Sequence, residues 1–214
     1  MPKPIARRWP DATLVCVASG PTLTLGELLQ IRGVFPVVAV NDAIRWIPWA
    51  EVLYSSDRPW WRFYGGVPDF RGQKVGVGWK IGDASPIPGA DDVHVLTHTG
   101  TTGLETNPTG LRTGGHSGYA AINLAVHLGA RQIVLLGYSG GKVGGQSHFF
   151  GRHPSGLTES SEANYALFRR AYDTLAPELT AAGVHVVNAT RQTLIDAFPR
   201  ADLAALVGVQ GASC

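Results

Sequence analysis

Short apolar runs alternate along the chain with stretches whose apolar residues recur at helical spacing. Most of the runs are continuously apolar, which is typical of strands buried on both faces of a sheet. The predicted strands are Thr13–Ala18, Pro36–Val40, Glu51–Ser55, Gln132–Leu136 and Val184–Val187, with weaker candidates at Lys74–Val77 and Val93–Leu96.

Three helices are predicted between these strands. The first begins after Thr24, where Glu27 completes a capping box. The second covers Ser117–Leu128 and stops at Gly129, and the third covers Glu159–Ala182. Alternation of buried strands with helices predicts an α/β fold: a modified Rossmann-like, mostly parallel sheet with helices on both faces.

Two long glycine-rich and polar segments interrupt this alternation, at residues 100–115 and 137–157. Loops of this length in a compact domain are usually either functional or disordered. We expect a single nucleotide-binding α/β domain over residues 1–214, with these segments as long loops or a lid. Plain mobile loops are the alternative.

Composition excludes several classes of protein. The formal net charge of +2 is too balanced for nucleic-acid binding by bulk charge, although a local basic patch stays open. No apolar stretch approaches the ~18 residues of a membrane span, and no apolar segment follows the basic N-terminus as in a secretion signal. Cys16 and Cys214 lie at opposite ends of the chain, which argues against a disulfide framework. We therefore expect a cytoplasmic protein.

Small and polar residues follow four of the predicted strands. In an open parallel sheet, ligands bind at the carboxyl ends of the strands, so we expect a nucleotide cradle there. Its candidate residues are Gly20, Pro21, Thr22, Asn41, Asp42, Ser55, Asp57 and Tyr138. The chain has neither a G-x-G-x-x-G fingerprint nor a P-loop, so hydride transfer and P-loop hydrolysis lose their usual support. The alternative is that Gly20 and Pro21 only turn a strand into a helix.

The start of the second predicted helix is a candidate anion site. Backbone N–H groups at Ser117 and Gly118 would converge there with the Ser117 hydroxyl and, when His116 is protonated, with its imidazolium ion. The alternative is an ordinary N-cap at Ser117, with His116 exposed to solvent.

His148 and His153 lie in the second long segment and are the candidate catalytic residues. Their spacing of five is not that of a helical metal-binding pair, so we predict no metal site. An imidazole near a nucleotide site can act as a general base, because its reference pKa is ~6.5. A structural role for each histidine is the alternative.

Four of the six tryptophans fall within residues 46–61, with arginines among them. Aromatic rings with guanidinium groups can stack on sugars or bases and pair with phosphates. We therefore predict that Arg58, Trp60 and Trp61 bind an acceptor. Core packing of two short helices is the alternative.

The order of these motifs carries a resemblance to known families. A Gly-Pro turn at 19–23 follows the first strand, Asn41 ends the second, and Tyr-Ser-Ser-Asp stands at 54–57. A Ser-Gly helix start at 117 and a histidine loop at 147–153 come later. This pattern, over about residues 14–196, resembles the bacterial sialyltransferase family, which uses CMP-sugars on a modified Rossmann fold. It is also similar to the archaeal hydroxymethylpterin diphosphokinase family and to uncharacterised phage proteins of that superfamily.

Because the histidine loop follows the Ser-Gly helix, the resemblance is greater to the sialyltransferases. It implies a donor nucleotide along Gly20, Pro21 and Thr22, with Asn41 and Ser55 on its ribose and phosphate. It also implies phosphate contacts from Ser117 and Gly118. His153 would be the general base that deprotonates the acceptor hydroxyl.

Three functions follow as expectations. The first is a glycosyltransferase that moves a sugar from a nucleotide-sugar donor to a hydroxyl of a glycan, a small molecule or a hydroxylated DNA base, with no cofactor required. The second is a Mg-ATP-dependent diphosphokinase of a pterin-like substrate, with Asp42 and Asp57 holding Mg²⁺. The third is an inactive nucleotide-binding module. The acceptor and the oligomeric state stay open.

Overall fold

The computed structural model describes residues 2–211 and has one eight-stranded sheet in which every neighbouring pair of strands is parallel. The strands are β1 (Thr13–Val17), β2 (Val37–Val40), β3 (Val52–Tyr54), β4 (Gln73–Val77), β5 (His94–Gly100), β6 (Gly110–Arg112), β7 (Gln132–Leu136) and β8 (His185–Asn188). The helices are α1 (Leu25–Ile31), α2 (Arg58–Phe63), α3 (Ser117–His127), α4 (Glu162–Ala181) and α5 (Leu203–Gly211), with a 3₁₀ helix at Asn41–Arg45. The predicted α/β class is confirmed, and the sheet is parallel throughout.

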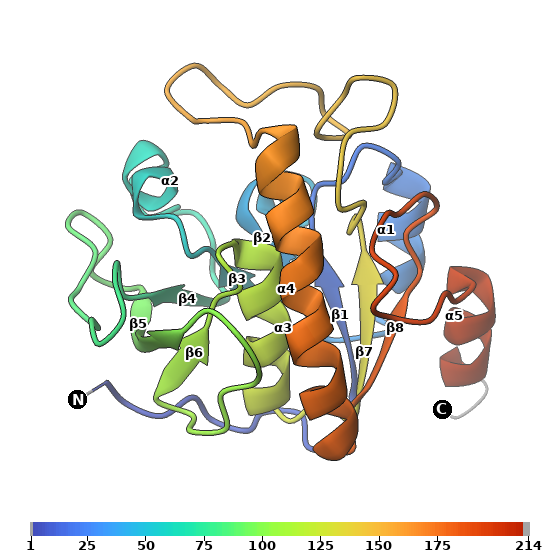
Figure 1. The fold of residues 1–214 in the computed structure, drawn as a ribbon, viewed down its shortest axis with the longest axis horizontal. Coiled ribbons are helices and arrows are strands. Elements are labelled where there is room, and N and C mark those ends of the chain that lie inside the picture. The colour runs from blue at the N-terminus through green and yellow to red at the C-terminus, as the bar shows by residue number, and fades with distance from the viewer. Residues whose placement is uncertain (1, 212–214) are drawn as a thin grey trace.

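Each face of the sheet carries its own apolar core, as continuous apolar strands require. In β1, Leu14 and Cys16 point into one core, and Val15 and Val17 point into the other. Helices α3 and α4 cover the first face, in front of the sheet in Figure 1. Helices α1, α2 and α5 supply side chains to the second core.

The order of the strands fixes where a ligand can enter. From β1 the chain builds outward through β2, β3, β4 and β5 to β6, then returns through α3 to β7 on the other side of β1. The direction of winding therefore reverses between β1 and β7, and crevices at such switch points bind ligands in doubly wound sheets. In Figure 1 the carboxyl ends of β1 and β7 point upward, toward the long segment that joins β7 to α4.

The first helix begins as its sequence predicts. The hydroxyl of Thr24 accepts a hydrogen bond from the Glu27 backbone at 3.3 Å, and the Glu27 carboxylate accepts one from the Thr24 backbone at 2.8 Å. This reciprocal capping box confirms the predicted helix start. The end of α3 is also as predicted, because Gly129 has a φ of 108°, which only glycine adopts readily.

One prediction about irregular structure needs correction, and one helix was missed. Residues 100–115 are not one long loop, because they contain β6, which pairs with β5 at the edge of the sheet. Strand β6 has only three residues, with polar residues on either side, so no apolar pattern in the sequence marks it as a strand. Helix α5 was also not predicted, although its apolar residue Leu203 packs into the second core. Residues 137–157, in contrast, contain no helix or strand, only isolated bridges.

Among the described residues, no helix is both long enough and apolar enough to cross a membrane.

Candidate functional site

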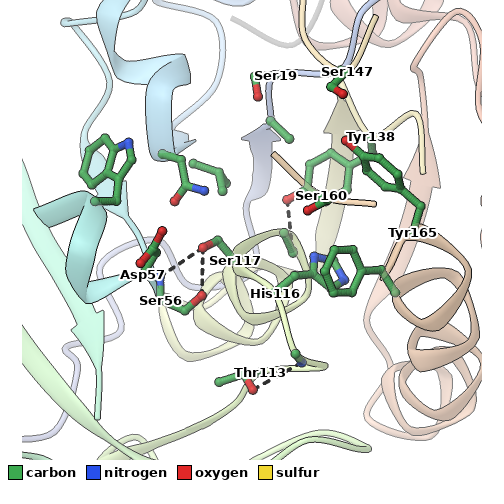
Figure 2. Close-up of a pocket in the computed structure, with 18 of the residues that line it drawn as sticks. Ser19, Ser56, Asp57, Thr113, His116, Ser117, Tyr138, Ser147, Ser160 and Tyr165 are labelled. Atoms are coloured by element: carbon green, nitrogen blue, oxygen red, sulfur yellow. Dashed lines mark hydrogen bonds between the residues drawn. The ribbon is translucent and has the colours of Figure 1, made fainter. Parts of the chain in front are cut away.

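A cavity of about 490 Å³ opens at the carboxyl ends of the strands, within the ~300–1,000 Å³ range of small-molecule sites (Figure 2). Its walls come from the turns after β1, β2, β3, β4 and β7, the start of α3, the segment between β7 and α4, and one side of α4. Nine of the predicted site residues line it: Gly20, Asn41, Asp57, Trp60, Ser117, Gly118, Tyr138, His148 and His153.

The remaining predicted residues do not line this cavity: Pro21, Thr22, Asp42, Ser55, Arg58 and Trp61. Trp61 is fully buried and donates its indole N–H to the backbone oxygen of Ser55 at 3.0 Å. Arg58 is 8% exposed and forms an ion pair with Asp83 at 3.4 Å. Trp61 and Arg58, two of the three residues predicted to bind an acceptor, thus contribute to the packing of α2, as in the alternative interpretation of the tryptophan-rich segment.

A histidine and a carboxylate form a close pair at the wall of the cavity. Nδ1 of His153 lies 3.1 Å from Oδ2 of Asp42, and the Asp42 side chain is completely buried behind the imidazole. Asp42 also accepts hydrogen bonds from the Trp60 indole at 3.1 Å and from the Tyr64 hydroxyl. The carboxylate is therefore held from several sides, and one of its oxygens faces Nδ1 at the edge of the His153 ring.

The protonation state of Asp42 follows from these contacts. Burial acts to raise the pKa of its carboxyl, but its polar neighbours His153, Tyr64 and Trp60 outweigh burial and hold the pKa below its usual value. Asp42 is thus ionised at neutral pH. An ionised carboxylate at Nδ1 favours the tautomer in which this nitrogen carries the proton, so Nε2 is left as the basic nitrogen.

His148 lies beside this pair, with its ring centroid 4.2 Å from that of His153. Its Nδ1 is 2.8 Å from the Ser19 hydroxyl, and its ring stacks on Phe150 at 5.0 Å. Burial, with a further contribution from the neighbouring His153, lowers the pKa of His148 to about 4. A neutral His148 is suited to hydrogen bonding rather than to taking up a proton at neutral pH.

The segment that carries both histidines is anchored at several points. Phe150 stacks on Trp46, the residue that follows the 3₁₀ helix, with ring centroids 4.8 Å apart. The Glu159 carboxylate accepts hydrogen bonds from the Ser147 hydroxyl at 3.1 Å and from the His153 backbone at 3.3 Å. These contacts fix the loop over the carboxyl ends of the strands without regular secondary structure.

The start of α3 faces the same cavity. His116, not Ser117, is the N-cap, because its Nδ1 accepts from the Tyr119 backbone N–H at 3.4 Å. His116 is also only partly exposed, and burial lowers its pKa to about 3. The ring is therefore neutral at pH 7 and does not supply the imidazolium charge expected at this anion site. With Nδ1 as acceptor, it carries its proton on Nε2, which has no partner among the described residues.

Two serine hydroxyls meet at this helix start. Figure 2 shows Ser117 pointing toward Ser56. The Ser117 hydroxyl lies 2.8 Å from the Ser56 hydroxyl and accepts a hydrogen bond from the backbone N–H of Ser56 at 3.0 Å. Asp57 lies directly beside them at the cavity wall. This cluster joins the turn after β3 to the first turn of α3.

The turns after β1 and β7 approach each other very closely. The N–H of Gly20 donates to the backbone oxygen of Gly137 at 2.8 Å, and a Cβ on Gly20 would lie 2.4 Å from the Ser139 hydroxyl. The lack of a side chain at Gly20 is therefore required by the neighbouring turn, whether or not a ligand is bound.

Several lining residues were not predicted from the sequence: Trp79, His98, Thr113, Tyr165, Phe168 and Tyr172. Trp79 could have been found, because it follows the predicted strand at 74–77 as the other candidates follow theirs. The aromatic residues of α4 had no such signal, since their helical spacing is equally typical of core packing.

Among the described residues, no group of three or more potential ligands is arranged to hold a metal ion. Asp42, predicted under the diphosphokinase alternative to bind Mg²⁺, has both carboxylate oxygens engaged by protein groups.

Neither a protein-family model nor a curated protein nor a solved structure matches this chain. The resemblance to sialyltransferases therefore stays a prediction. What the site can do is argued below from its geometry.

Proposed function

We propose that the protein is a glycosyltransferase that moves a sugar from a nucleotide-sugar donor to an acceptor hydroxyl. The observation that carries the proposal is the pair of His153 with the buried, ionised Asp42 at the wall of a cavity that could hold a nucleotide. A base oriented by a carboxylate is what the deprotonation of a weakly acidic hydroxyl needs.

In the proposed reaction, Nε2 of His153 takes the proton of the acceptor hydroxyl. The acceptor oxygen forms a bond to the anomeric carbon of the donor as the bond from that carbon to the phosphate oxygen breaks. The electron pair of the broken bond leaves with the nucleotide phosphate. Asp42 acts as a positioning residue, because it stabilises the imidazolium ion that forms.

The start of α3 supplies the groups that would stabilise the leaving phosphate. The hydroxyls of Ser56 and Ser117 and the backbone N–H groups of the first turn can donate to phosphate oxygens. His116 also lines the cavity, and its neutral ring carries a buried Nε2–H donor that has no partner among the described residues.

The diphosphokinase alternative is less well supported by the same geometry. It needs Asp42 as a Mg²⁺ ligand, but Asp42 would first have to give up its hydrogen bonds to Trp60 and Tyr64. A buried carboxylate that loses such bonds is destabilised by about 1–3 kcal/mol per bond.

A thermal-shift panel of CMP, CDP, UDP, GDP and ATP, each with Mg²⁺ and with EDTA, tests the nucleotide site. A ligand at a hundred times its dissociation constant adds ~2.7 kcal/mol to stability, so one of CMP, CDP, UDP or GDP should raise Tm in EDTA. With the matching nucleotide-sugar, His153→Ala should keep this Tm rise and lower the rate of sugar release by about 100-fold or more. His185→Ala, on the exposed end of β8, is the matched control and should change neither.

Other outcomes would contradict the proposal. A Tm rise with ATP and Mg²⁺ alone, together with loss of activity in Asp57→Asn, would favour the diphosphokinase. No rise with any nucleotide would favour a protein that does not use nucleotides at this site.

A further inference from the structure

Trp79 presents an indole ring to solvent at the edge of the central cavity. Its side chain lines both that cavity and a second pocket of about 410 Å³ beside it. Trp79 is 65% exposed, whereas Trp60 and Trp61 are 2% and 0% exposed. The ring therefore contributes little to the core, and its position between two pockets favours a role in binding a ligand.

The turn that carries Trp79 is tightly built. The Asp83 carboxylate accepts from the Trp79 backbone N–H at 2.7 Å, and the Asp83 backbone donates to the oxygen of Lys80 at 2.9 Å. A Cβ on Gly78 would lie 1.9 Å from the backbone oxygen of Asp83, so the backbones on the two sides of this turn are in direct contact. The indole is thus held outward by a fixed backbone.

The second pocket is positively charged. Arg58, Arg62 and Lys80 line it, against a single carboxylate, Asp83. Asp83 already pairs with Arg58 at 3.4 Å. Among the described residues, the side chains of Arg62 and Lys80 form no ion pair, so two positive charges face this pocket without an acidic partner.

We infer that Trp79, Arg62 and Lys80 form an acceptor subsite for a small sugar-sized ring that carries a phosphate or carboxylate group. The ring stacks on the exposed indole, and its anionic group pairs with Arg62 and Lys80. Because Trp79 and His153 line the same central cavity, a hydroxyl of this ring can face the base. The assignment of the ligand as an acceptor rests on the proposed function, whereas its binding to the subsite does not.

A nucleic-acid strand fits these features less well. Strands need a basic groove that follows several phosphates, whereas the pocket offers two unpaired cations and the chain has a net charge of only +2.

Indole N–H signals in NMR spectra of ¹⁵N-labelled protein test the subsite directly. The chain has six tryptophans, and the signal missing from Trp79→Leu identifies the one from Trp79. The probes are glucose 6-phosphate, glucuronate, glucose, inorganic phosphate and a single-stranded oligonucleotide. We expect the Trp79 signal to shift with both anionic sugars at concentrations at which glucose and phosphate alone have little effect.

Variants then separate the two parts of the subsite. Trp79→Leu should weaken binding of glucose 6-phosphate, followed at the backbone signals of Lys80 and Arg62, by about tenfold, which is ~1.4 kcal/mol. Lys80→Gln with Arg62→Gln should remove the preference for charged over neutral sugar. Ile81→Ala is the matched control, because Ile81 is 63% exposed on the same turn but lines neither pocket.

Three outcomes would overturn the inference: no shift of the Trp79 signal with any probe, equal shifts with glucose and glucose 6-phosphate, or a shift only with a single-stranded oligonucleotide. A parallel titration with CMP, UDP and GDP, read at the amides of Ser117 and Gly118, tests the nucleotide site alone. If those amides do not shift while the Trp79 signal does, the proposed function fails, whereas the subsite at Trp79, Arg62 and Lys80 is supported.

Discussion

At the scale of single residues, two titratable groups in and beside the cavity have opposite charge states, although burial favours the neutral form of both. Asp42 is fully buried, but its polar neighbours His153, Tyr64 and Trp60 keep it charged. His116 has lost water and gained only one backbone N–H, so it stays neutral. A charged acceptor group and a neutral donor group on the same site are the usual arrangement for acid–base chemistry.

The neutral state of His116 predicts a pH dependence of stability. Its pKa is about 3 in the folded protein against 6.5 for the free side chain. Below pH 6.5 the unfolded chain therefore takes up a proton on His116 that the folded chain does not bind. As a result, the free energy of unfolding is highest above pH 6.5 and decreases as the pH falls from there toward 3. His116→Asn should keep the helix cap, since asparagine is a good N-cap, and remove this loss.

Urea unfolding at pH 7 and pH 5 measures the effect. We expect wild type and His116→Asn to have similar stability at pH 7, and the variant to lose ~2 kcal/mol less between pH 7 and pH 5. Equal losses in the two proteins would show that the folded state accepts the proton on His116.

The sequence predicted which residues follow the strands but not which way their side chains point. Asn41 and Asp42 both follow β2, yet Asn41 has a φ of 51° and lines the cavity, while Asp42 points inward to Trp60 and Tyr64. His153 was predicted from its residue type and segment. Its pairing with Asp42 could not be predicted, because the two lie more than a hundred positions apart in sequence and meet only through the anchored loop.

At the scale of elements, the closest approach in the site is between the turns after β1 and β7. Gly20→Ala would place its Cβ 2.4 Å from the Ser139 hydroxyl and 2.5 Å from the Gly137 oxygen. The two turns must then move apart, which should cost about 1–3 kcal/mol of stability. If the proposed function is right, the same shift should weaken nucleotide binding at the switch point. Chemical denaturation and the thermal-shift panel measure the two effects.

Gly26→Ala is the matched control for this substitution. Gly26 lies in α1, is exposed, and its Cβ would meet only the Thr24 hydroxyl at 3.9 Å. Because alanine is the better helix former, this variant should gain up to about 1 kcal/mol. If Gly20→Ala is as stable as wild type, the contact between the two turns is not as tight as the structure has it.

The elements that could be predicted are those whose own residues carry the pattern. Strands β1, β2 and β7 are continuously apolar because both of their faces are covered, and α1 carries its capping box. The edge strand β6 has three residues and depends on its pairing with β5, so no local pattern marks it. Its existence is a property of the assembled sheet.

At the scale of the whole molecule, the two apolar cores share one sheet and cannot separate without breaking it. Strand β1 pairs with β2 on one side and β7 on the other, and its alternate side chains enter both cores. Cys16 is the fourth of the five residues of this strand and is fully buried, and burial raises the pKa of its thiol to about 12. The thiol is thus protected both by exclusion of reagent and by lack of thiolate.

Cys16 therefore reports opening of the entire sheet. In Cys214→Ser, where Cys16 is the remaining thiol of the chain, labelling by a thiol reagent should be more than about a thousandfold slower than in the urea-unfolded protein, since domains are stable by ~5–15 kcal/mol. Denaturant should raise the labelling rate in parallel with global unfolding, and a bound nucleotide should lower it by mass action. Fast labelling that denaturant does not change would mean that β1 separates from β2 or β7 on its own. The switch point that the proposed function needs would then not be a fixed part of the fold.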